Sequence, residues 1–222
     1  MVAYPALVAG TRVTVSAAAF VPPSPSLTSL RAAAAGCTAC HLHELGTQTV
    51  FGTGPASADV VMVGEQPGDQ EDRAGEPFVG PAGHLLDRAL SAAGIPRESV
   101  YLTNTVKHFK WTPSPNGKRR IHAKPDTREI GACKPWLDAE LAVLRPRLVV
   151  ALGATAAQAL MGRTFKVTQS RGQVFDLPPA SRLVATVHPS SILRSPGEEN
   201  RAAEFDRLVA DLTVVAKEIA SG

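Results

Sequence analysis

One short segment, Lys118-Arg119-Arg120-Ile121-His122, combines charge for binding an anion with a side chain able to act as a nucleophile. It lies within residues 107–124, which contain six Lys and Arg and no Asp or Glu. Clustered positive charge of this kind suits the phosphates of a nucleic acid. Histidine has an unperturbed pKa close to neutral pH, so its imidazole can attack an electrophile or carry a proton. The segment therefore indicates a loop that brings His122 to a polyanion.

Polar residues follow three apolar runs of the kind that form buried strands. Gly64-Glu65-Gln66-Pro67-Gly68-Asp69 follows the first run, and its glycines permit close approach of the backbone to a ligand. Asn104 follows the second run, and its amide matches the amide edge of a pyrimidine. His188-Pro189-Ser190-Ser191 follows the last run. Each pattern also has an ordinary explanation as a turn or a helix cap, so none specifies a function alone.

A second glycine-rich stretch, Pro77-Phe78-Val79-Gly80-Pro81-Ala82-Gly83, precedes a predicted helix. The helix N-terminus would suit an anion. Phe78 is poorly placed for a core in such a loop and well placed to stack on a planar ring. The stretch therefore indicates one wall of a binding site.

Three cysteines point to a metal or redox site in a reducing compartment, since two of them are spaced as Cys37-x-x-Cys40. With Cys133 they leave a fourth ligand to be found. A zinc site requires a partner such as His41, His43 or His108, and an iron–sulfur cluster requires the same count. Cys133 alone has the further explanation of a small buried apolar residue.

The elements that must position these residues alternate between strand and helix. Strands are predicted at 59–64, 100–103, 147–152 and 183–187, and helices at 26–35, 85–93, 127–144, 155–161 and 198–219. This order predicts a three-layer α/β/α fold with a central four-stranded parallel sheet. Ligands bind outside the carboxyl ends of such strands, so the three polar clusters should share one edge. Pro113, Pro115 and Gly117 predict an irregular structure for residues 107–124.

Length and composition fit one domain in a chain of 222 residues with a net charge of +3. Residues 1–25 end in Val21-Pro22-Pro23-Ser24-Pro25 and are predicted to be a poorly ordered N-terminal extension, leaving residues 26–222 as the domain. No apolar run is long enough to span a membrane. A monomer in the cytoplasm, associated with nucleoid DNA, is expected.

Together, the motifs at 64–69, 77–80, 103–104 and 188–191 resemble those of the uracil-DNA glycosylase superfamily. Cys37-x-x-Cys40 and Cys133-Lys134-Pro135-Trp136 resemble its iron–sulfur family 4 enzymes. The segment 118–122 resembles the UdgX branch, whose members become covalently attached to uracil-containing DNA. Two departures from the usual family 4 pattern are His108, in place of the third cluster cysteine, and Gln66, in place of a small residue. Gln66 agrees with the UdgX branch.

The resemblance implies uracil excision, with a preference for single-stranded DNA, and a role for each matched residue. The implied catalytic residues are His122 as nucleophile, Glu65 as its partner, Asp69 in a lesser supporting role, and His188 as a donor to the leaving base. The implied uracil contacts are Gln66, Gly68, Phe78, Asn104 and His188. The implied DNA contacts are Lys107, Arg119, Arg120, Ser190, Ser191 and Arg194. The implied ligands of a 4Fe-4S cluster are Cys37, Cys40, His108 and Cys133.

Two alternatives to a self-consuming enzyme stay open at this point. The first is a turnover enzyme of the same superfamily that uses water as the nucleophile, with His122 acting only in binding. The second is a non-catalytic iron–sulfur module that binds nucleic acid. For Arg119 and Arg120, the alternative to phosphate contact is that they hold the loop closed, or that they belong to a solvated basic loop.

Overall fold

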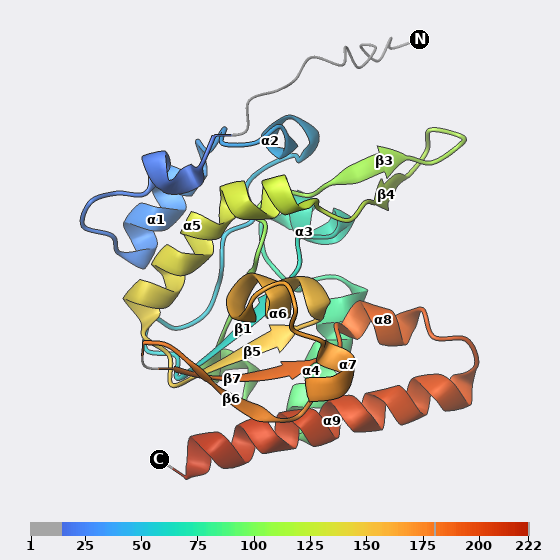
Figure 1. The fold of residues 1–222 in the computed structure, drawn as a ribbon. Helices are drawn as coiled ribbons and strands as arrows, with labels where there is room; N and C mark the ends of the chain where they lie inside the picture. Colours follow the sequence, from blue (N-terminus) through green and yellow to red (C-terminus); the bar gives the residue numbers. More distant parts are fainter. Residues whose placement is uncertain (1–14, 180, 222) are drawn as a thin grey trace.

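A five-stranded sheet lies between two layers of helices in the computed structural model, which describes residues 15–179 and 181–221 (Figure 1). The strands are β1 (Val60–Gly64), β2 (Val100–Asn104), β3 (Trp111–Pro113), β4 (Arg120–His122), β5 (Leu148–Leu152), β6 (Val174–Leu177) and β7 (Ser181–Thr186). The helices are α1 (Leu27–Ala34), α2 (Leu42–Leu45), α3 (Asp69–Ala74), α4 (Pro81–Ala92), α5 (Thr127–Leu144), α6 (Ala154–Met161), α7 (Val167–Ser170), α8 (Pro189–Leu193) and α9 (Glu198–Ala220). Short 3-10 turns are η1 (Ala17–Phe20) and η2 (Arg97–Ser99).

The central sheet has the order β2-β1-β5-β7-β6. Its first four strands are parallel, and the connections from β1 to β2, from β2 to β5 and from β5 to β7 all contain helices. β6 pairs antiparallel with β7 and forms an edge. The predicted α/β/α class and the four parallel strands are confirmed. The fifth strand was missed because β6 lies half exposed at an edge and lacks the continuous apolar run of a central strand.

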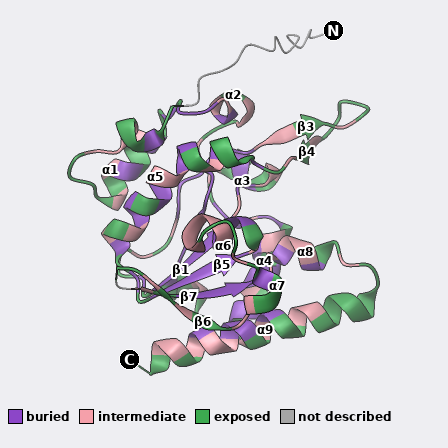
Figure 2. Cartoon of the chain, viewed as in Figure 1, coloured by how far each residue is buried: buried purple, intermediate pink, exposed green. Residues whose placement is uncertain are grey.

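Side chains alternate between the two faces of the sheet, and each face has its own apolar core. One face packs against α4, α8 and α9, with Met62, Leu102 and Val150 at its centre. The other packs against α5, α6 and α7, with Val61, Val149 and Leu183 at its centre. Figure 2 shows the central strands β1, β5 and β7 largely buried, with exposed residues on the helices around them.

A third apolar cluster joins the N-terminal region to the outer side of α5. η1 and α1 pack on α5, and Ala17, Leu30 and Trp136 are all fully buried there. Ser26 caps α1 through reciprocal hydrogen bonds with Ser29. The prediction of a poorly ordered extension over residues 1–25 is therefore wrong for residues 15–25. Residues 1–14 lie outside the described residues.

Two elements between the predicted strands also differ from expectation. The basic stretch forms an antiparallel hairpin, with Trp111 opposite His122 and Pro113 opposite Arg120. It projects beside α3 in Figure 1. The prediction that residues 107–124 are irregular is thus wrong for β3 and β4, because Pro113 ends β3 and only Pro115 and Gly117 lie in the turn between the two strands. The segment between the predicted strand at 59–64 and the predicted helix at 85–93 contains α3, whose cap Gly68 donates its N–H to Glu71.

No helix among the described residues is both long and apolar enough to cross a membrane.

Candidate active site

A cavity of about 870 Å³ opens at the carboxyl ends of the parallel strands. Residues that follow β1, β2, β5 and β7 line it, and the hairpin closes one side. The lining includes Glu65, Gln66, Gly68, Phe78, Asn104, Ile121, His122, Lys124, Thr155, His188, Ser190, Ser191 and Arg194. The prediction that the polar clusters share one edge of the sheet is therefore confirmed.

The inner wall of the cavity holds an amide beside an aromatic ring. Asn104 is the last residue of β2 and is only 3% exposed, and Phe78 is 6% exposed. Gly64 lies opposite Asn104 in the sheet, where a Cβ would overlap the Asn104 amide and come within 2.7 Å of the Phe78 ring. A glycine at the end of β1 is thus required for both side chains to reach the cavity. Phe78 itself has a φ of 60°, an uncommon backbone conformation for a non-glycine residue.

Glu71 ties together the two glycine-rich loops that form this wall. Its carboxylate accepts hydrogen bonds from the backbone N–H of Gly68, at 3.1 Å, and of Gly80, at 2.7 Å. Glu71 was not predicted as part of the site, because its partners lie in two loops that only the fold brings together. It fixes the approach of both loops to the cavity.

His188 is held as a neutral imidazole of defined tautomer. Its Nδ1 lies 3.2 Å from the backbone N–H of Ser190, which donates to it, and 2.8 Å from the Ser190 hydroxyl. Nδ1 therefore carries no proton, and Nε2 carries one. Burial, followed by the positive charge of Arg194 and the nearby His122, lowers the pKa of His188 to about 4. At neutral pH the ring presents a single N–H donor.

His122 stands at the mouth of the cavity opposite a carboxylate. It ends β4 and is 49% exposed, and its Nε2 lies 3.5 Å from Oε1 of Glu65. Burial lowers the pKa of His122, the Glu65 charge acts in the opposite direction, and Arg194 lowers it further. The net direction is below the ordinary value, so the ring is neutral at pH 7 and has a free lone pair. The other carboxylate oxygen of Glu65 accepts a hydrogen bond from the hydroxyl of Thr155.

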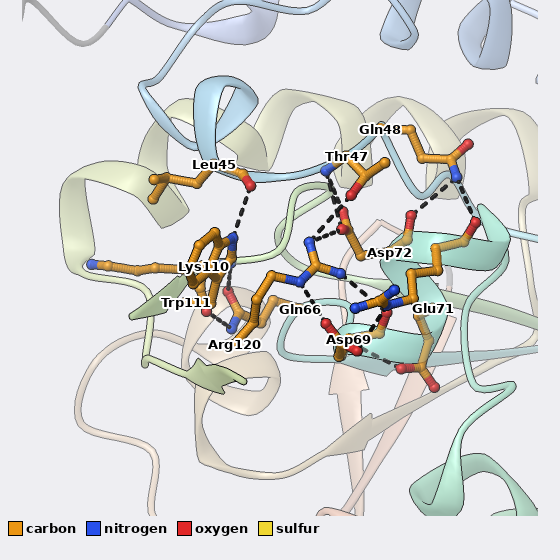
Figure 3. Close-up of polar contacts among 12 residues, drawn as sticks. Leu45, Thr47, Gln48, Gln66, Asp69, Glu71, Asp72, Lys110, Trp111 and Arg120 are labelled. Carbon is orange, nitrogen blue, oxygen red and sulfur yellow. Dashed lines mark hydrogen bonds and ion pairs between the residues drawn. The ribbon is translucent and has the colours of Figure 1, made fainter. Parts of the chain in front are cut away.

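The hairpin that carries His122 is anchored to α3 through Arg120 (Figure 3). The Arg120 guanidinium pairs with Asp69 at 2.5 Å and with Asp72 at 2.6 Å. Burial opposes ionisation of Asp69, but hydrogen bonds from Arg73 and Arg120 outweigh it and lower the pKa of Asp69. Of the expectations for Arg120, which were phosphate contact, a solvated basic loop or holding the loop in place, these ion pairs agree with the last. Asp69 bonds Arg120 and Arg73 and does not contact His122, so any effect of Asp69 on His122 passes through the hairpin.

Gln66 anchors the other end of the hairpin. Its Nε2 donates to the carbonyl oxygens of Lys110 and Ala123, each at 3.1 Å, and its Oε1 accepts from the Lys110 N–H. Because the side-chain amide is occupied in this way, it is not free to bind a base as expected. Contact between Gln66 and a ligand is left to its backbone.

Lys107 is not positioned to contact DNA, contrary to expectation. Its side chain is 1% exposed, and Nζ lies 2.5 Å from Glu140 Oε2 on α5. Nζ also donates to the Thr103 hydroxyl, at 2.6 Å, and to the Asn104 carbonyl oxygen, at 2.7 Å. A buried lysine of this kind needs a carboxylate partner. The basic segment contains none, so the sequence did not indicate that Lys107 is buried. By contrast, Arg119 and Arg194 are exposed.

Residues 51–213 match the Uracil DNA glycosylase superfamily. This chain belongs to that superfamily. It is 39% identical over 176 residues to a type-4 uracil-DNA glycosylase of Thermotoga maritima, covering 79% of this chain and 84% of the relative. It is 38% identical over 167 residues to a type-4 uracil-DNA glycosylase of Pyrobaculum aerophilum, covering 72% and 81%. A type-5 uracil-DNA glycosylase of Thermus thermophilus is 32% identical over 161 residues, covering 64% and 68%.

In this member of the uracil-DNA glycosylase superfamily, Cys37, Cys40 and Cys133 are buried in the cluster between α1 and α5. None forms a disulfide. Two of the sulfurs accept hydrogen bonds, Cys37 from Trp136 Nε1 at 3.3 Å and Cys133 from the Lys107 N–H at 3.2 Å. Burial, opposed by Lys107 and reinforced by the other two cysteines, raises the pKa of Cys133 to about 12. Thiolates in this setting would need a cation to stabilise them.

His108, the expected fourth ligand, is also buried, and burial lowers its pKa to about 4. Its Nε2 lies 2.9 Å from the Thr49 hydroxyl. In composition, three thiols and a neutral imidazole fit a thiolate-bound cofactor. In arrangement, the described part of the chain contains no group of three His, Cys, Asp or Glu poised to hold a single metal ion.

Proposed function

We propose that this protein is a uracil-DNA glycosylase that excises uracil, preferentially from single-stranded DNA, and then becomes attached to the sugar through His122. The observation that supports the attachment most directly is the placement of a neutral imidazole 3.5 Å from Glu65, at the mouth of a cavity containing Asn104 and His188. Similarity to the type-4 enzymes supports the excision step.

Excision begins with a nucleotide turned out of the base stack, which costs least in single-stranded DNA. Phe78 offers an apolar surface to the base, and Asn104 reads its amide edge. His188 Nε2 donates to a uracil carbonyl oxygen as negative charge develops on the leaving base. A donor aimed at developing charge contributes about 10²–10³ in rate. Because Nδ1 is occupied by Ser190, His188 has the tautomer that this role requires.

Capture follows the break of the bond between C1′ and the uracil nitrogen. That electron pair leaves with the base, which takes a proton from water, and the sugar acquires oxocarbenium character. The His122 nitrogen that does not face Glu65 donates its lone pair to C1′. The resulting imidazolium loses the proton on its other nitrogen to Glu65 or water. The neutral imidazole is then a poor leaving group, so the adduct persists.

The cofactor proposed for Cys37, Cys40, His108 and Cys133 is a 4Fe-4S cluster. When bound, such a group would link the N-terminal region to α5 and to the segment after β2, and no step of excision passes through it. Purified protein with a brown colour and broad visible absorption would support this assignment, together with about four irons per chain. A colourless protein containing zinc would contradict it.

A denaturing gel after incubation with a uracil-containing oligonucleotide tests the proposed function. A shifted band that survives heat and SDS is expected, and His122→Ser should abolish it while uracil release continues with water as nucleophile. Free abasic product without a band would contradict attachment. A band of undiminished intensity in His122→Ser would show that another residue is the nucleophile.

A turnover glycosylase is the second candidate, because the half-exposed position of His122 also admits water to Glu65. Counting uracils released per protein molecule distinguishes the two. A self-consuming enzyme stops at about one, whereas many turnovers would favour the second candidate.

A further inference from the structure

Glu65 has a second partner that the proposed chemistry does not yet use. One of its carboxylate oxygens faces His122 Nε2, and the other accepts a hydrogen bond from the hydroxyl of Thr155. Thr155 is 5% exposed, and 90 residues of chain separate it from Glu65. We propose that Thr155 is a positioning residue, which orients the Glu65 carboxylate so that His122, and not water, captures the sugar. This inference rests on the proposed function of His122.

The backbone at Thr155 is fixed by the surrounding structure. It lies in the first turn of α6, which packs into the core through Ala156 and Ala157, both fully buried. The turn before the helix is fixed by Gly153, which has a φ of 91° and donates its N–H to the Thr186 carbonyl oxygen at 2.8 Å. A Cβ at Gly153 would come within 3.0 Å of the His188 Cβ. The position of Thr155 is thus set by contacts of the helix and the sheet.

Glu65 needs such a partner because only its backbone is otherwise fixed. Its carbonyl oxygen accepts the Val106 N–H at 2.9 Å, which holds the main chain after β1. The side chain is 21% exposed and can rotate about several bonds. A hydrogen bond to one oxygen restricts this rotation and leaves the other oxygen toward His122. The N-terminus of α6 also favours the negative charge of the carboxylate.

The bond should affect capture more than excision. Excision depends on Asn104 and His188, which are held by Lys107 and Ser190 through contacts that do not include Thr155. Capture depends on Glu65 stabilising the imidazolium of His122. Loss of the Thr155 hydroxyl would therefore change the ratio between adduct and free abasic product, while the rate of uracil release stays nearly the same.

Thr155→Val tests this because it keeps the shape of the side chain and removes the hydroxyl. Thr155→Ser keeps a hydroxyl and should restore the ratio. Thr213→Val makes the same change on α9, outside the residues that line the cavity, where the hydroxyl donates to the Val209 carbonyl oxygen within its own helix. The full-length proteins are compared with a single-stranded uracil oligonucleotide under single-turnover conditions. Gels give the adduct, and alkaline cleavage gives the free abasic product.

In Thr155→Val the ratio of adduct to free product is expected to fall about 5- to 30-fold, which is the size of effect that losing one hydrogen bond to a charged group produces. Thr155→Ser and Thr213→Val should keep ratios near that of the wild-type protein. The pH midpoint of adduct formation should also move lower in Thr155→Val, because a displaced Glu65 no longer raises the pKa of His122. A purely structural role would lower release and adduct by the same factor and leave the midpoint in place, which would overturn the inference. An unchanged ratio in Thr155→Val would overturn it alone. Uracil release without any adduct in the wild-type protein would overturn the proposed function and this inference with it.

Discussion

At the scale of single residues, opposed influences set the pKa of His122, the nucleophile of the proposed reaction. Burial lowers its pKa, and Glu65 raises it less than burial lowers it. The lone pair needed for attack is present only above the pKa. We therefore predict that adduct formation persists below pH 6.5, the ordinary histidine value, and is lost as the pH falls through the lowered pKa.

The measurement is the ratio of adduct to released uracil at pH values between about 4.5 and 8, with circular dichroism to show that the protein stays folded. A midpoint above 6.5 would contradict the lowered pKa of His122.

His188 is a second residue whose protonation state follows from its contacts. In the proposed reaction the Nε2–H of His188 donates to the leaving base, so His188→Ala should slow uracil release by about 10²–10³ under single-turnover conditions. The adduct formed per uracil released should stay the same, since His122 and Glu65 are untouched. Equal release rates in the variant and the wild-type protein would remove His188 from catalysis.

Sequence reasoning located the residues around the cavity but not their partners. Glu65, Asn104 and His188 follow apolar strands, so their common edge could be derived, although their roles stay predictions. Thr155 gave no signal, because its hydroxyl bonds a carboxylate that lies 90 positions away in the sequence. Lys107 was mistaken for a DNA contact because the sequence does not show that its charge pairs with the buried carboxylate of Glu140.

At the scale of elements, the hairpin of β3 and β4 determines where His122 stands. Arg120 fastens it to α3, and Trp111 Nε1 donates to the Leu45 carbonyl oxygen at 2.8 Å (Figure 3). Removing this anchor should let the hairpin move while leaving the base pocket in place. Arg120→Met is thus predicted to reduce adduct formation more than uracil release.

Arg119→Met is the matched control, because Arg119 is the exposed neighbour of Arg120 in the hairpin. It should weaken DNA binding at most, and high salt should mimic its effect. If the two variants lost adduct to the same degree, the role of Arg120 would be charge and not anchoring.

The regular elements were predicted well where packing and propensity agree. The helix over 127–144 matches α5 in both bounds despite Pro135 in its interior, because Trp136 and Leu137 are completely buried. The hairpin, α3 and β6 were missed because each is short and half exposed, so none has an apolar period long enough to detect. Their stability comes from contacts with distant segments, such as the Arg120 ion pairs.

At the scale of the whole molecule, a buried ion pair joins the sheet to α5 beneath the cavity. Glu140 is fully buried and accepts hydrogen bonds from Lys107, Tyr101 and Thr103, as well as from the Gly52 N–H at 3.2 Å. Lys107 also donates to the Asn104 carbonyl oxygen and its own N–H donates to Cys133 Sγ. The pair therefore connects the wall of the cavity at Asn104 to the cysteine cluster at Cys133, although the two are separate in sequence.

Breaking one half of this pair leaves the other charge buried without a partner, which costs more than the pair itself contributes. Glu140→Ala is expected to lower the free energy of unfolding by about 3–5 kcal/mol, measured by urea denaturation. Replacing both charges, in Lys107→Met/Glu140→Leu, removes the uncompensated charge, so the double variant should be more stable than Glu140→Ala. Strictly additive losses would contradict this, because they would mean that the two side chains contribute independently.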